Sequence, residues 1–122
     1  MQLSEDIPAT QILVNAYDEH SVVIADIEYT QSLILTPVSV EPWPVMTFAD
    51  INDEALLMLL REDCDVVLIG TGAVHYPLTA QQLTLFYDKH MGIETMNTRA
   101  ACRTYNLLAN EGRRVLAALL IM

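Results

Sequence analysis

The first third of the chain alternates short apolar and polar stretches in a way that is typical of β-strands. Residues 11–16 form a short apolar run, and residues 21–28 are rich in β-branched side chains that partly alternate with polar ones. Residues 30–36 form a third such stretch, which Pro37 ends. Short strands at this spacing predict an antiparallel meander.

Proline changes the pattern over residues 37–46, where three prolines fall within eight residues. Because proline cannot donate a ladder hydrogen bond, we expect an extended loop here rather than a central strand. Trp43 lies between two of these prolines and is expected to fold over an apolar edge of the core. A contact with a partner protein through Trp43 is the alternative.

The second half changes to a helical period that alternates with short apolar runs. Its expected helices run from a cap at Asn52 or Asp53 to about Glu62, from Thr79 to a stop at Gly92, and from Asn97 or Thr98 to near Gly112. Its expected strands are 66–69, 93–96 and 115–122. For the last helix the expected apolar stripe is Ala101, Thr104, Leu107 and Leu108. We expect the Tyr105-Asn106 pair in the middle of this helix to hydrogen-bond a neighbouring loop and so hold the fold.

This order of elements predicts a β-α-β-α-β unit and an α/β fold. A helix of about twelve residues extends for roughly 18 Å, about one strand length, so short connections make the strands parallel. Ligands of such sheets bind at the loops that leave the carboxyl ends of the strands. Loops 70–78 and 97–98 meet that description, and we expect them to open onto one common edge.

Composition indicates one domain over residues 1–122, with 52% hydrophobic residues and a net charge of −10. Residues 1–60 hold ten acidic residues and no Lys or Arg. Because nucleic acids and anionic membrane surfaces both require clustered cations, we expect neither as a partner. No apolar run is long enough to span a bilayer, and residues 1–10 lack an export pattern, so the expected location is the cytoplasm.

Cysteine and histidine give no signature of catalysis or metal binding. Cys64 and Cys102 are too few for a disulfide framework and are expected to be free thiols. Cations beside Cys102 would favour its thiolate, but no base is linked to it by spacing, and a buried inert thiol is the favoured interpretation. The three histidines show no ligand-like spacing, so we expect no metal and no cofactor.

Glycine and arginine mark the candidate site. Gly70, Thr71 and Gly72 follow a strand directly, where two glycines permit a tight turn or an anion nest. The third glycine of a dinucleotide motif and the Lys of a phosphate loop are absent, so the plain turn is favoured. His75 in the same loop either lines a cleft or faces solvent.

Arg99 and Arg103 lie four residues apart in the first turns of a predicted helix. Cations at these positions oppose the helix dipole and repel one another. Each effect destabilises the helix by about a few tenths of a kcal/mol. Something negative should offset them. The favoured source is acidic side chains of this chain, and the alternative is an external anion or partner held by Arg99, Arg103 and free amides near Thr98.

Several of these segments together resemble the domain of unknown function 498 family. They are I-G-T-G at 69–72, Pro77, G-I-E-x-M-x-T at 92–98, A-A-x-R-T-Y-N-x-L at 100–108 and E-G-R at 111–113, with looser agreement at Tyr29, Ser32–Pro37 and Trp43. The resemblance implies a compact three-layer α/β domain with a mixed sheet and no established catalytic activity. Its members include a mitochondrial assembly factor of respiratory complex I and many small bacterial proteins. Relatives often carry basic residues where this chain has Ala73, Val74 and His75.

Three hypotheses follow for function. The first is a non-enzymatic protein-interaction or assembly module, whose candidate site is Gly70, Thr71, Gly72, His75, Thr98, Arg99 and Arg103. The second is a binder of, or weak enzyme acting on, a small anionic metabolite at loops 70–76 and 97–99. The third is a homo-oligomeric module that uses apolar loop residues such as Trp43 and Val45.

Overall fold

The computed structural model describes residues 11–18 and 20–121. Residues 1–10, Glu19 and Met122 lie outside the described part, and with them the segment expected to lack an export pattern. The last strand, expected over 115–122, ends at Leu119. The strands are β1 Val14–Tyr17, β2 Val22–Ile24, β3 Ile27–Tyr29, β4 Leu33–Thr36, β5 Ser39–Pro42, β6 Val66–Gly70, β7 Gly92–Met96 and β8 Val115–Leu119. The helices are α1 Asp53–Leu57, α2 Ala80–Tyr87 and α3 Thr98–Asn110, with a 3-10 turn, η1, at Phe48–Asp50.

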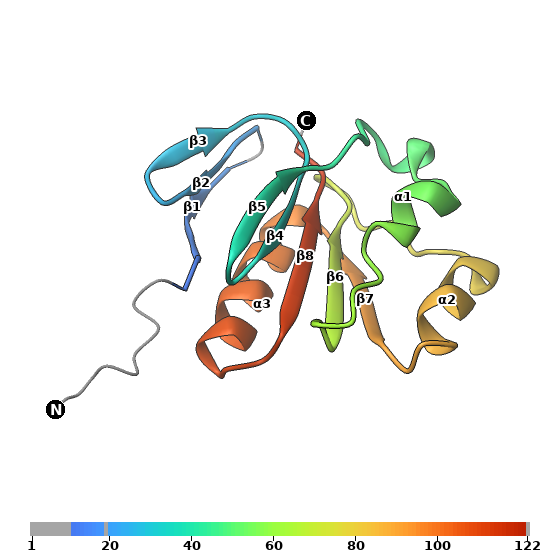
Figure 1. Cartoon of the computed structure of the whole chain (residues 1–122). Coiled ribbons are helices and arrows are strands. Elements are labelled where there is room, and N and C mark those ends of the chain that lie inside the picture. The colour runs from blue at the N-terminus through green and yellow to red at the C-terminus, as the bar shows by residue number, and fades with distance from the viewer. Residues whose placement is uncertain (1–10, 19, 122) are drawn as a thin grey trace, which may run out of the picture.

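A mixed five-stranded sheet in the order β5-β4-β8-β6-β7 forms the middle layer. Strands β8, β6 and β7 are parallel, as the β-α-β-α-β pattern predicts, whereas β4 pairs antiparallel with both β5 and β8. Strand β8 is therefore central, and its five residues are all buried. Figure 1 shows α1 and α2 together at one end of this sheet and β1–β3 at the other.

Alternate residues of each central strand enter two separate cores. Ile34, Val67 and Leu116 face α1 and α2 in one core. Leu33 and Leu68 face α3 and the small antiparallel sheet β1-β2-β3 in the other core. Both faces of the sheet are thus covered, which explains the continuous apolar runs of β6 and β8. The three-layer α/β fold with a mixed sheet is confirmed.

The N-terminal strands differ from the prediction in two respects. The single strand expected over 21–28 is a hairpin, because Ala25 and Asp26 both take positive φ (52° and 66°) and form a two-residue turn. The strand expected over 30–36 begins at Leu33 and belongs to the five-stranded sheet, not to the meander.

The proline-rich segment contains a strand that we did not expect. Residues 39–42 form β5 at the edge of the sheet, where a terminal proline is tolerated. Trp43 follows it and is buried, with 3% of its surface exposed, so the prediction that it folds over the core is confirmed. The alternative of a partner contact through Trp43, and self-contact through Trp43 and Val45, are wrong because both residues are core.

The starts of the helices and the end of α3 lie close to the predicted positions, whereas α1 and α2 end earlier than expected. Thr79 and Gln82 form the predicted capping box, and Asn97 caps α3. Helix α1 ends at Leu57 rather than Glu62, because the amides of Leu59 and Leu60 bond three residues back in tightened turns. Helix α2 is ended by His90 in a left-handed conformation (φ 57°), whereas Gly92 begins β7.

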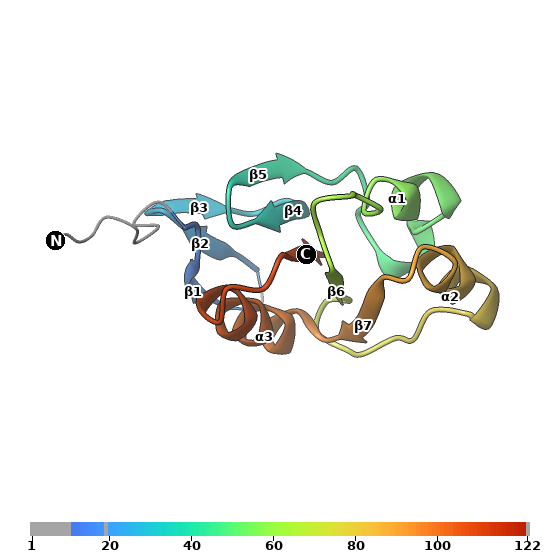
Figure 2. The same cartoon turned by 60° about the horizontal axis from the view of Figure 1, so that its bottom comes forward.

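The buried stripe of α3 is also displaced from the prediction. It consists of Thr98, Ala101, Cys102, Tyr105 and Ala109. Leu107 is 59% exposed. Tyr105 can be buried because its hydroxyl donates to the carbonyl of Ile12 at 2.6 Å. Asn106 exchanges two hydrogen bonds with the backbone of Val14, so it bonds the strand β1 rather than the expected loop (Figure 2 shows α3 beside β1).

Candidate functional site

The loop after β6 and the start of α3 lie side by side at the carboxyl edge of the parallel strands. The amide of Thr98 donates to the carbonyl of Gly72 at 2.8 Å, and the amide of Gly72 donates to Thr98 Oγ1 at 2.9 Å. The two loops therefore share one edge, as predicted. The structure brings Gly70, Thr71, Gly72 and Thr98 together there.

The two glycines of the Gly-Thr-Gly turn are required for different structural reasons. A Cβ on Gly70 would lie 2.9 Å from the Cα of Thr98 and 3.1 Å from the Cβ of Ala101. This close approach lets α3 pack directly on β6. Gly72 has a φ of 95°, which only glycine adopts without strain. The favoured interpretation of a plain structural turn agrees with both observations.

Thr71 holds the shape of the loop from inside. Thr71 is 1% exposed. Its Oγ1 donates to the Val74 carbonyl at 2.6 Å and accepts from the Tyr76 amide at 3.1 Å. The side chains of Val74 and Tyr76 point outward from this loop and are 55% and 47% exposed. Tyr76 stacks on Phe48, with ring centroids 5.2 Å apart. The loop thus presents apolar side chains on a fixed backbone.

Thr98 and its neighbours use their polar groups internally. Thr98 Oγ1 donates to the Leu120 carbonyl at 2.8 Å, so this hydroxyl joins α3, the loop after β6 and the end of β8. The amide of Ala100 donates to Asn97 Oδ1 at 2.8 Å. The amides of Thr98 and Ala100 are therefore not free to bind an external anion. The N-terminus of α3 is capped by its own chain.

Arg99 and Arg103 project from the exposed side of α3. Among the described residues, ion pairs form between Arg61 and Glu41 (2.7 Å) and between Arg114 and Asp65 (2.6 Å), and neither Arg99 nor Arg103 takes part. Arg103 Nη1 lies 3.5 Å from the hydroxyl of Tyr17. The favoured expectation, that acidic side chains of this chain offset the two arginines, is therefore wrong for the described structure.

His75 faces solvent and bonds the neighbouring strand. Its Nε2 lies 2.9 Å from Thr95 Oγ1, and the contact is exposed. This bond holds the loop against β7. Of the two interpretations of His75, the solvent-facing loop residue is confirmed.

The cysteines have the properties of core residues. Both are free and buried, as expected. Burial raises the pKa of the Cys102 thiol to about 12, although the charge of Arg103 opposes the shift. Burial and the neighbouring Asp63 raise the pKa of Cys64 to about 11. The expected burial of Cys102 is confirmed, and its raised pKa agrees with the inert-thiol interpretation. In the described residues no three potential metal-ligating side chains come together.

Sequence reasoning missed the contact between Phe48 and Tyr76, which joins the segment before α1 to the loop after β6. The two residues are 28 positions apart, and no periodicity connects them. The exposure of Val74 and Tyr76 could not be predicted either, because the sequence does not indicate which way an apolar side chain in a loop points.

A family model described as protein of unknown function (DUF498/DUF598) matches residues 14–120. The chain belongs to this family. The match covers nearly every described element, so the resemblance in the sequence is confirmed.

Curated relatives of the family include a human protein named NADH dehydrogenase [ubiquinone] 1 alpha subcomplex assembly factor 3. It is 30% identical over 114 residues, which are 92% of this chain and 62% of the relative. The chain thus spans about 60% of the length of the first curated relatives it matches.

Solved structures show the same fold. A crystal structure from Bordetella parapertussis is 33% identical with a TM-score of 0.87, covering 93% of this chain and 98% of that one. An NMR structure from Xanthomonas campestris is 30% identical with a TM-score of 0.83, covering 99% and 92%. None of the helices in the described ranges has the length and apolar character to cross a bilayer.

Proposed function

We propose that this chain is a non-enzymatic interaction module of the assembly-factor type, which binds another protein through loop 73–76 and the exposed face of α3. One observation carries the proposal. Arg99 and Arg103 are exposed and lack an internal carboxylate partner within the described residues, on a chain with sixteen acidic and six basic residues.

The neighbouring loop supplies the apolar part of such a surface. Val74 and Tyr76 are held outward by Thr71 and by the stack on Phe48. Protein interfaces typically combine aromatic and Arg side chains with a rigid backbone. The name of the human relative, an assembly factor, supports a protein partner rather than a substrate.

The test is affinity capture from the native organism with the double variant Arg99→Glu/Arg103→Glu. We expect the captured partner to be lost, because both cations would become anions facing an acidic surface. The matched control is Lys89→Glu/Arg113→Glu, which changes the net charge equally at two other exposed sites. A partner that both double variants lose equally, or neither loses, contradicts the proposal.

A small anionic metabolite is the second candidate, because the same two guanidinium groups would attract it. The internally bonded amides of Thr98 and Ala100 count against a phosphate cradle. A thermal-shift series with phosphate, sulfate and citrate distinguishes the two candidates. A rise in melting temperature that Arg99→Glu abolishes would favour the metabolite, because a ligand of the folded state must stabilise it.

A further inference from the structure

A second candidate surface lies at the end of β5. It is a hollow of about 760 Å³ lined by residues 30–32, 42–47 and Ile121. Trp43, Val45 and Ile121 are buried in its apolar lining, whereas Met46 is 78% exposed. None of its lining residues, all of them described, carries a charge.

The lining is fixed before anything binds. Trp43 Nε1 donates to the Ala55 carbonyl at 3.3 Å, and its amide donates to the Ser32 carbonyl at 3.0 Å. Ser32 Oγ in turn accepts from the amide of Ile121 at 3.2 Å. Because these bonds come from three different segments, the hollow is part of the packed fold.

Two further hollows adjoin the first. One shares residues 30–32 and Pro42 with it and includes Glu28 and Glu41. The other shares Pro44 and includes Asp50 and Glu54, together with the exposed Leu57. We call the three together the β5 groove. It has an apolar centre and acidic residues at both ends.

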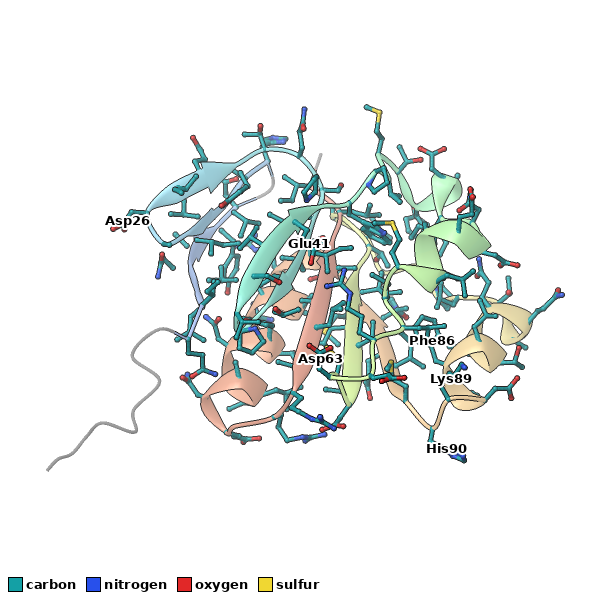
Figure 3. All side chains as sticks on the ribbon, viewed as in Figure 1. Asp26, Glu41, Asp63, Phe86, Lys89 and His90 are labelled. Carbon is teal, nitrogen blue, oxygen red and sulfur yellow. The ribbon has the colours of Figure 1, made fainter. Side chains whose placement is uncertain are left out.

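Cations are missing from this groove. Among the described residues that line its three parts, none is Lys or Arg. Arg61 donates two hydrogen bonds to Glu41, at 2.7 and 3.1 Å. The other acidic residues of the groove, Glu28, Asp50 and Glu54, form no ion pair in the described structure. Lys89 lies beyond the end of α2, far from Glu41 in Figure 3.

We propose that the β5 groove binds an extended segment of a partner protein that has an apolar centre and Lys or Arg on both sides of it. The apolar side chains would cover the exposed Pro42, Pro44 and Met46, which lie over the buried Trp43, and burial of apolar area drives such binding. The flanking cations would meet Glu28 at one end and Glu54 at the other, which fixes position and speeds association. The occupant differs in charge from the acidic partner expected at Arg99 and Arg103, so this inference goes beyond the proposed function.

The probe is a set of three synthetic peptides of equal length. The first has lysines at both ends and a Leu/Val centre, the second has glutamates at both ends with the same centre, and the third has lysines with a Ser centre. The chain has one tryptophan, Trp43, so its emission reports occupancy of the groove directly. We expect the first peptide to bind at least about tenfold more tightly than either of the others, and less tightly at high salt.

Charge reversal locates the site. Glu28→Lys/Glu54→Lys should weaken the first peptide about tenfold, whereas the control Glu62→Lys/Glu111→Lys, equal in charge change and outside the groove, should leave it within about twofold. All four residues are exposed, so both variants should fold. Equal affinity for the three peptides, an equal effect of the two double variants, or stronger binding to anionic vesicles than to peptide would overturn the proposal. Arg99→Glu/Arg103→Glu should not weaken the peptide, which keeps this test separate from that of the proposed function.

Discussion

At the scale of single residues, Thr98 is the polar side chain on which the carboxyl edge of the sheet most depends. Its hydroxyl accepts from the Gly72 amide and donates to the Leu120 carbonyl, and the residue is buried. Thr98→Val keeps the shape but leaves both groups unpaired, so we expect the free energy of unfolding to fall by about 2–4 kcal/mol. Thr98→Ser keeps the hydroxyl and should lose only about 1 kcal/mol. Urea denaturation measures both, and equal losses would show that the methyl group, not the hydroxyl, matters.

Arg99 gives a prediction of opposite sign. It lies in the first turn of α3, where a cation opposes the helix dipole, and no ion pair in the described structure compensates it. Arg99→Glu should therefore raise the free energy of unfolding by about 0.3–1 kcal/mol at low salt. Arg113→Glu, outside the helix, serves as the control. A loss of stability in Arg99→Glu would indicate that an internal partner holds this guanidinium in solution.

The residue scale also shows what local sequence can reveal. The Gly-Thr-Gly turn was correctly favoured as a turn, because glycine after a strand signals backbone geometry. That Gly70 is required by the Cα of Thr98, 28 positions away, could not be predicted, because the constraint comes from packing. The same holds for Thr98, whose two hydrogen-bond partners belong to other elements.

At the scale of elements, α3 attaches the N-terminal strands to the rest of the fold. Asn106 bonds both backbone groups of Val14, at 2.9 and 2.8 Å, much as a neighbouring strand would. Asn106→Ala should lower the free energy of unfolding by about 1–2 kcal/mol and speed the hydrogen exchange of the Val14 amide. Asn110→Ala, one turn later and exposed, should change neither. Unchanged exchange at Val14 in Asn106→Ala would show that β1 does not depend on this bond.

Elements whose signals are local were predicted, and those that depend on neighbours were not. The capping box of α2 and the Asn97 cap of α3 follow from side chains within one turn. The β2–β3 turn was missed because Ala25 and Asp26 adopt a conformation usually left to Gly or Asn. The α3 stripe was displaced because a buried Tyr105 is acceptable only when its hydroxyl finds a partner, here Ile12.

At the scale of the whole molecule, the two covered faces of the sheet decide how the chain reacts with thiol reagents. Cys64 and Cys102 lie in different cores, and burial raises the pKa of their thiols from 9.0 to about 11 and about 12. Because only the thiolate reacts, a thiol reagent at neutral pH should label both cysteines at least about a hundredfold more slowly in the folded chain than in urea. The rate should rise as pH increases toward these values. One thiol that reacts at the unfolded rate would contradict the packing of its core.

The topology of the parallel half was predictable, whereas the way the two halves join was not. Alternation of helix and strand with short connections predicts that β6, β7 and β8 run parallel, although not that β6 lies between the other two. Nothing in the sequence indicates that β4 leaves the meander to pair with β8, because strand pairing at a distance of more than eighty residues is a property of the assembled core.

The central position of β8 has a consequence for synthesis. Strands β4 and β5 meet β6 and β7 only through β8, which is the last of these strands to leave the ribosome. Until residue 119 has emerged, a nascent chain holds two half-sheets with open edges, which are the parts most prone to pair with other chains. The sheet therefore closes only once β8 has emerged, and before that point the open strand edges are free to pair with other chains.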